Sequence, residues 1–108
     1  MLEERRTRRS EEPKRALGIF LSSCRTRLGA HALAVGTGRG ELVAGSGDGA
    51  LLVALVGARV AAGGTRPDAM AVCPIRVGER RYVITSLGNP IDDHVAAGVE
   101  RILARASH

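Results

Sequence analysis

Apolar residues recur at helical spacing in the first periodic segment of the chain, residues 14–28. Leu17, Phe20, Leu21, Cys24 and Leu28 lie at positions i, i+3, i+4, i+7 and i+11, which form one stripe on a helix. A glycine at position 29 follows, and glycine commonly ends helices. We therefore expect a helix from about residue 14 to residue 28 with one buried face.

The segment before this helix has no apolar periodicity. Residues 1–12, MLEERRTRRSEE, are dominated by charges of both signs. Such a composition is typical of a solvated segment. We predict that residues 1–12 form a charged flexible tail and that residues 13–108 form a single domain. Ser10 is a suitable N-cap for a helix that Pro13 enters.

Two pairs of short apolar runs predict two β-hairpins. HALAV and ELVAG flank the turn segment GTGRG, residues 36–40, and MAVCPIRV and RYVITSLG flank Gly78-Glu79. In the second hairpin the two-residue turn places Val77 opposite Arg80, and hence Ile75 opposite Tyr82. Pro74 cannot donate a ladder hydrogen bond, so its strand is expected to lie at a sheet edge or to be bulged there.

Two further segments predict helices. Residues 50–62, ALLVALVGARVAA, follow Asp48, which is a good N-cap, and end before Gly63-Gly64. Residues 92–106 carry a single apolar stripe made of Val95, Val99, Ile102, Leu103 and Ala106.

The resulting order is helix, hairpin, helix, hairpin, helix. Both faces of the hairpins carry apolar residues, so the sheet needs cover on both sides. The first and third helices, with one stripe each, suit one face, and the middle helix suits the other. The predicted fold class is α+β, an antiparallel sheet of four to five strands sandwiched by helices.

The middle helix is unusual because Arg59 is its only charged residue. A helix that is apolar on every side is expected to be buried on every side, and a chain of 108 residues has no further element to cover it. The small residues along it also allow another helix to approach closely. We predict that it packs against its copy in a second chain. The predicted dimer or partner interface is Leu51, Leu52, Ala54, Leu55, Ala58, Arg59 and Ala62. The alternative is that the sheet and the following linker cover this helix.

The glycine-rich stretch GTGRGELVAGSGDG, residues 36–49, raises the question of a phosphate-binding loop. A dinucleotide site needs G-x-G-x-x-G between a strand and a helix, and a P-loop needs Gly-Lys-Ser/Thr. The glycines here have neither spacing, and Asp48 would repel phosphate. We expect a hairpin turn followed by a tight strand-to-helix joint, with Gly36, Gly38 and Gly40 at positive φ in the turn.

Composition and charge exclude several other classes. The net charge of +5 comes from 16 basic and 11 acidic residues, and all the basic residues except Lys14 are arginines. This bias is typical of GC-rich bacterial genomes. The charge is not concentrated in one segment, and Phe20 and Tyr82 are the only aromatic residues. Because nucleic-acid binders combine a basic patch with stacking aromatics, we expect no nucleic-acid partner.

No arrangement of residues predicts catalysis or metal binding. The three histidines have no metal-ligand spacing with Cys24 and Cys73, and two separated cysteines suit the core of a cytoplasmic protein. The longest apolar stretch, residues 50–58, is too short to span a bilayer. We predict no catalytic residue, no metal and no cofactor.

The element order and the segment AHALAVGTGRGELVAGSGDGALLVALVGARVA resemble the dynein light chain roadblock family, whose bacterial members regulate small GTPases. The family's hairpin pattern is matched by Leu33, Val35, Gly40, Leu42, Val43, Ala44 and Gly47, and the resemblance covers residues 14–106. It implies a roadblock/profilin-like domain that forms a homodimer, docks a Ras-like small GTPase and alters its nucleotide cycle without supplying a catalytic group. The family sheet usually has a third strand after the middle helix, whereas residues 62–69 contain Gly-Gly and Pro67 and are poor strand material.

Three functional hypotheses follow. The first is an interaction protein, a roadblock-like dimer that acts on a GTPase. The second is a small-ligand sensor or a general protein-interaction module without a GTPase partner, because sheets covered by helices also form ligand pockets. The third is an enzyme of unknown type, for which the sequence offers no pair of nucleophile and base.

Overall fold

The computed structural model describes residues 2–106, with side chains described for residues 13–105. Its elements are α1 (Leu2–Leu28), β1 (Ala32–Thr37), β2 (Leu42–Gly47), α2 (Ala50–Ala61), β3 (Met70–Val77), β4 (Arg80–Leu87) and α3 (Asp93–Ala106). The predicted order of helix and hairpin is confirmed. Between α2 and β3 the described residues form no further strand, so the sheet has four strands, the smaller number predicted.

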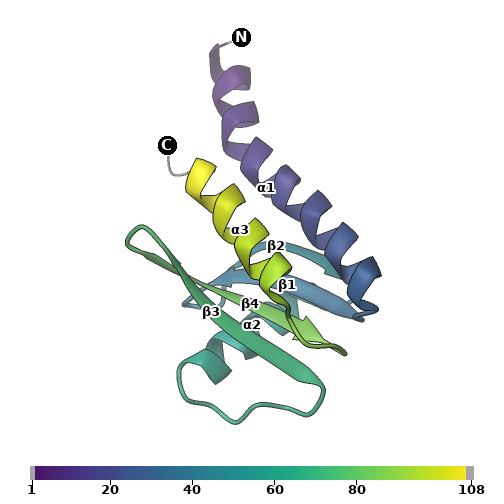
Figure 1. Cartoon of the computed structure of the whole chain (residues 1–108). Helices are drawn as coiled ribbons and strands as arrows, with labels where there is room; N and C mark the ends of the chain where they lie inside the picture. The colour runs from purple at the N-terminus through teal and green to yellow at the C-terminus, as the bar shows by residue number, and fades with distance from the viewer. Residues whose placement is uncertain (1, 107–108) are drawn as a thin grey trace.

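The four strands form one antiparallel sheet in the order β2-β1-β4-β3. Helices α1 and α3 lie side by side over one face and α2 lies under the other, as the layers in Figure 1 show. This is the sandwich that the patterning predicts. The larger core lies between the sheet and the α1–α3 layer and includes Leu17, Leu21, Leu33, Ile84, Val95 and Val99, all fully buried. A smaller core lies between the sheet and α2.

The register of the second hairpin agrees with the sequence. Val77 lies opposite Arg80 and Ile75 opposite Tyr82, and Gly78 has a φ of 64° in the turn between them. Strand β3, which contains Pro74, lies at the edge of the sheet as predicted. The proline is therefore tolerated because one side of β3 has no neighbouring strand.

The first helix begins much earlier than its apolar stripe. The prediction of a start near residue 14 with Ser10 as N-cap is wrong, because α1 begins at Leu2 and contains Pro13 in its interior. Glu and Arg, which dominate residues 3–12, have high helix propensity and extend the helix beyond the part that packs. That these residues act as a flexible tail stays a prediction.

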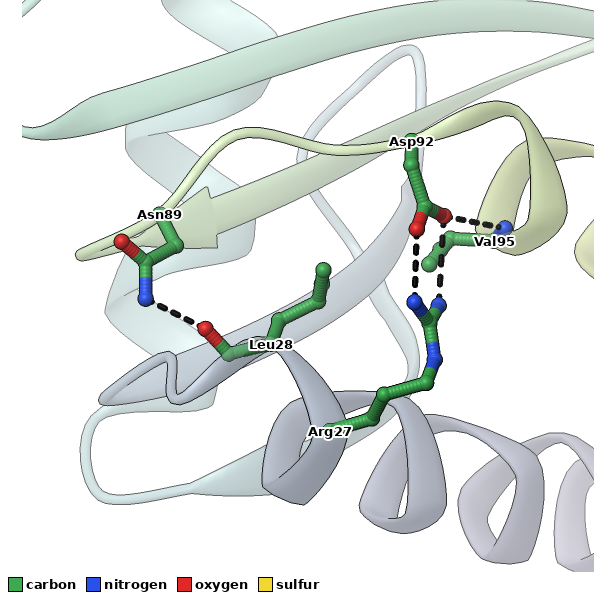
Figure 2. Close-up of polar contacts among 5 residues, drawn as sticks. All are labelled: Arg27, Leu28, Asn89, Asp92 and Val95. Atoms are coloured by element: carbon green, nitrogen blue, oxygen red, sulfur yellow. Dashed lines mark hydrogen bonds and ion pairs between the residues drawn. The ribbon is translucent and has the colours of Figure 1, made fainter.

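The ends of α1 and α3 are joined by polar contacts between residues far apart in sequence (Figure 2). Arg27 donates two hydrogen bonds to the Asp92 carboxylate, with N–O distances of 2.7 and 3.2 Å. Asp92 also accepts the backbone N–H of Val95 at 3.0 Å, which makes it the N-cap of α3. Nearby, the Asn89 amide donates to the carbonyl of Leu28, which belongs to the last turn of α1.

These contacts favour the ionised form of the Asp92 carboxyl group. The hydrogen bond from Arg27, followed by that from the Val95 backbone, lowers the pKa of the carboxyl from 3.8 to about 2. A lowered pKa means that the folded state binds the proton less tightly than the unfolded state does. The carboxylate therefore stabilises the fold above pH 3.8, and this contribution is lost as the pH falls from 3.8 towards 2.

We predict that Asp92→Asn lowers the urea midpoint of unfolding at neutral pH, because the neutral amide can still cap the helix but loses the ion pair with Arg27 and the negative charge at the helix N-terminus. The difference between the variant and the wild type should shrink as the pH falls from 3.8 towards 2. Urea titrations followed by circular dichroism across that range measure both effects. Asp93→Asn removes a neighbouring charge for which no side-chain hydrogen bond is found among the described residues, and it serves as the control. A difference that stays constant with pH would contradict the assignment.

Candidate functional site

Helix α2 presents two unlike faces. Its inner face, made of Val53, Ala54, Gly57 and Ala58, is buried against the sheet. Its outer face carries leucines that the rest of the chain leaves exposed, with Leu51 at 66%, Leu52 at 64% and Leu55 at 40% exposure. Among the predicted interface residues, Arg59 and Ala62 are also exposed.

The inner face lies unusually close to the sheet because small residues meet there. Gly57 lies directly over Thr85 of β4, and a Cβ on Gly57 would overlap the Thr85 hydroxyl. Gly36 of β1 lies under Ala54, where an added Cβ would be only 3.2 Å from the alanine Cβ. The same holds at Gly45 of β2, where the corresponding distance to the Cβ of Ala50 is 2.7 Å. A larger side chain at these points would push α2 away from the sheet.

This packing divides the predicted interface into two groups. Ala54 and Ala58 face the sheet of their own chain, at 1% and 6% exposure, so they set the depth of α2 rather than its outer surface. Leu51, Leu52, Leu55, Arg59 and Ala62 are the predicted residues that remain accessible. The sequence could not separate the groups, since every position of the helix except Arg59 is apolar.

One further leucine, missed by sequence reasoning, extends the exposed surface. Leu42 of β2 is 36% exposed, and its side chain lies beside Ala50 at the beginning of α2, since both come close to Gly45. We call Leu42, Leu51, Leu52 and Leu55 together the α2 apolar face. Several large apolar side chains gathered on one surface are typical of an interaction site.

The glycine-rich stretch, residues 36–49, contributes to the close packing of α2 against the sheet. Of Gly36, Gly38 and Gly40, only Gly40 has a positive φ, so the prediction for the other two is wrong. Gly36 instead belongs to β1 and makes room for α2. Asp48 is not the N-cap of α2, and that prediction is also wrong: Gly49 occupies the position at φ 74° with no side-chain cap.

The polar side chains outside the α2 apolar face form no metal-type cluster in the described part of the chain. The described residues contain no group of three or more His, Cys, Asp or Glu side chains that could hold a metal ion. On the α1–α3 side, Arg25 donates from Nε to the hydroxyl of Ser46 at 2.9 Å, and Ser22 donates to the same oxygen at 3.0 Å. These bonds tie α1 to β2. The Cys73 thiol has its pKa raised by burial and by the nearby charges of Glu100 and Asp93.

No family model and no curated protein matches this chain. Among solved structures this chain is similar to Myxococcus xanthus MglB, with a TM-score of 0.48 and 16% sequence identity. That alignment covers 87% of this chain and 84% of the other.

Within the described residues, no helix combines the length and the apolar character that crossing a membrane requires.

The close contact at Gly57 makes a specific prediction. Gly57→Ala should destabilise the protein by about 1–3 kcal/mol, because the new methyl overlaps the Thr85 side chain. Gly18→Ala is the matched control: Gly18 lies in α1 with no atom within 4 Å of an added Cβ, so higher helix propensity should stabilise the protein by up to about 1 kcal/mol.

Chemical denaturation measures both changes. The double variant Gly57→Ala/Thr85→Ala should recover part of the lost stability, because the alanine at position 85 frees the space that the new methyl needs. Equal effects of the two glycine substitutions would show that α2 does not approach the sheet as described.

Proposed function

We propose that this protein is a homodimeric scaffold that binds a Ras-like small GTPase and modulates its nucleotide cycle. The observation that carries the proposal is the α2 apolar face, a cluster of four exposed leucines on two adjoining elements. In a monomer these leucines are exposed to water, whereas a bound partner buries them.

The free energy of burying the exposed leucines favours a partner whose contact surface is also apolar. Full burial of one leucine side chain contributes about 1.5–3 kcal/mol, so burial of the exposed portions of several leucines is a substantial driving force. A second copy supplies a face of the same composition, related by a two-fold axis.

The GTPase part of the proposal rests on the sequence resemblance to the roadblock family. In such a protein the dimer provides a surface, and the nucleotide chemistry belongs to the bound GTPase. The proposal therefore assigns this chain a regulatory role and no catalytic residue of its own. It also assigns the protein to the cytoplasm, where small GTPases and reduced cysteines are found.

We predict that Leu51→Glu and Leu52→Glu, alone or combined, convert the dimer to a folded monomer. Both side chains are already about two-thirds exposed, so a charge there should leave the fold intact while opposing burial against a second copy. Light scattering coupled to size exclusion measures the mass, and circular dichroism checks the fold. Ile19→Glu is the control, because Ile19 has the same exposure, 67%, on α1 and away from α2. A wild-type chain that stays monomeric at high concentration would refute the dimer.

The GTPase is tested separately. Wild-type protein should retain from a native lysate a protein with a Gly-Lys-Ser/Thr phosphate loop, which mass spectrometry identifies. The nucleotide release rate of that purified GTPase should change when wild-type protein is added, and should change less with Leu51→Glu/Leu52→Glu. An unchanged rate would overturn the regulatory role while leaving the dimer in place.

A further inference from the structure

A second surface feature lies outside the α2 apolar face. A cleft of about 380 Å³ opens between the last turn of α2 and the β3–β4 hairpin. Ala58, Ala61 and Ala62 form its helical wall, and Pro74 and Val83 contribute to its floor. Its volume lies within the range of small-molecule sites, about 300–1,000 Å³, and these residues give it an apolar lining.

Two arginines stand at this cleft. Arg76 of β3 and Arg81 of β4 lie directly opposite each other in the ladder, and both line the cleft. Their neighbours Ile75 and Tyr82 belong to the core under α1 and α3, so alternation places both arginines on the α2 face of the sheet. Two like charges directly opposite each other destabilise a sheet.

None of the acids whose side chains are described forms an ion pair with either arginine. Within the part of the chain whose side chains are described, the Arg27–Asp92 contact is the ion pair found, and neither Arg76 nor Arg81 makes a side-chain hydrogen bond. A more polar hollow adjoins the cleft, shares Gly38 and Arg81 with it, and adds Arg39, Arg80 and Glu41. The cleft therefore combines an apolar interior with an edge of excess positive charge.

From this combination we infer that the cleft binds a small amphiphilic anion, with an apolar body against Ala61, Ala62 and Val83 and a carboxylate held by Arg76 and Arg81. The guanidinium groups supply charge-assisted donors for such a head group. The anion also relieves the repulsion between the two arginines, so binding stabilises the folded chain. The site adds a ligand to the scaffold and does not depend on the dimer.

Octanoate is the probe, because it joins a carboxylate to a flexible apolar chain. It should raise the melting temperature of the wild-type protein and bind one molecule per chain in calorimetry. Octan-1-ol, which lacks the charge, and acetate, which lacks the apolar body, should each bind at least about ten-fold more weakly. Octan-1-ol binding as tightly as octanoate, or acetate doing so, would overturn the inference.

Substitutions at the two arginines separate ligand binding from stability. Arg76→Gln and Arg81→Gln should each weaken octanoate binding about ten-fold. Without ligand each should melt at the same or a higher temperature than the wild type, because the repulsion is gone. Arg101→Gln on α3, across the sheet, is the charge-matched control and should bind like the wild type.

A variant of the apolar wall gives an independent measurement. Ala61→Phe fills the cleft from α2 while keeping both arginines, and it should weaken octanoate binding without affecting the acetate result. Wild-type affinity in Ala61→Phe or in both arginine variants would place octanoate elsewhere and overturn the assignment. Leu51→Glu/Leu52→Glu should retain octanoate binding, so a failure of the proposed dimer leaves this test unaffected.

Discussion

The close approach of α2 to the sheet is the contact on which the rest of this structure depends. Gly57 above Thr85, Gly36 beneath Ala54 and Gly45 beneath Ala50 allow the helix backbone to lie almost directly on the strands. Small residues on both sides leave little apolar volume between helix and sheet, so this core is thin. Most of the large apolar side chains on α2 are consequently directed away from the sheet, and this produces the exposed leucines.

The two faces of the sheet are therefore stabilised differently. On the α1–α3 side, large side chains such as Leu21, Ile84 and Val99 fill a thick core. On the α2 side, close backbone packing replaces side-chain volume. Helix α2 therefore has a closely packed side against its own sheet and an outer side on which leucines are exposed.

The sequence predicted much of this architecture. The stripe of Val95, Val99 and Leu103, the pairing of Ile75 with Tyr82, and the edge position of Pro74 each follow from local periodicity or turn geometry, and each is found. The predictions that failed concern element boundaries and the glycines of the first turn: α1 begins at Leu2, because residues with high helix propensity extend it beyond its apolar stripe. Asp48 has the right chemistry for a cap but lies one residue too early, and Gly36 provides space for a helix distant in sequence rather than a turn.

The candidate site was predicted in part, for a related reason. Uniform apolar composition marked α2 as unusual, yet it could not show that Ala54 points inward and Leu52 outward. The cleft beside Arg76 and Arg81 was not predicted, because it depends on how α2 is placed over the hairpin. Only the predicted register, which sets Val77 opposite Arg80, could have indicated that these two arginines face each other.

The contacts between the end of α1 and the beginning of α3 also bear on how the chain folds. Arg27 and Asp92 are 65 residues apart, and Asn89 reaches the carbonyl of Leu28 across 61 residues. During synthesis the first helix and the whole sheet leave the ribosome before α3 does. One side of the sheet is then only half covered, and the nascent chain depends on α3 to close the larger core. Contacts of such long range form slowly, so this interval is the stage at which the chain is most prone to aggregate.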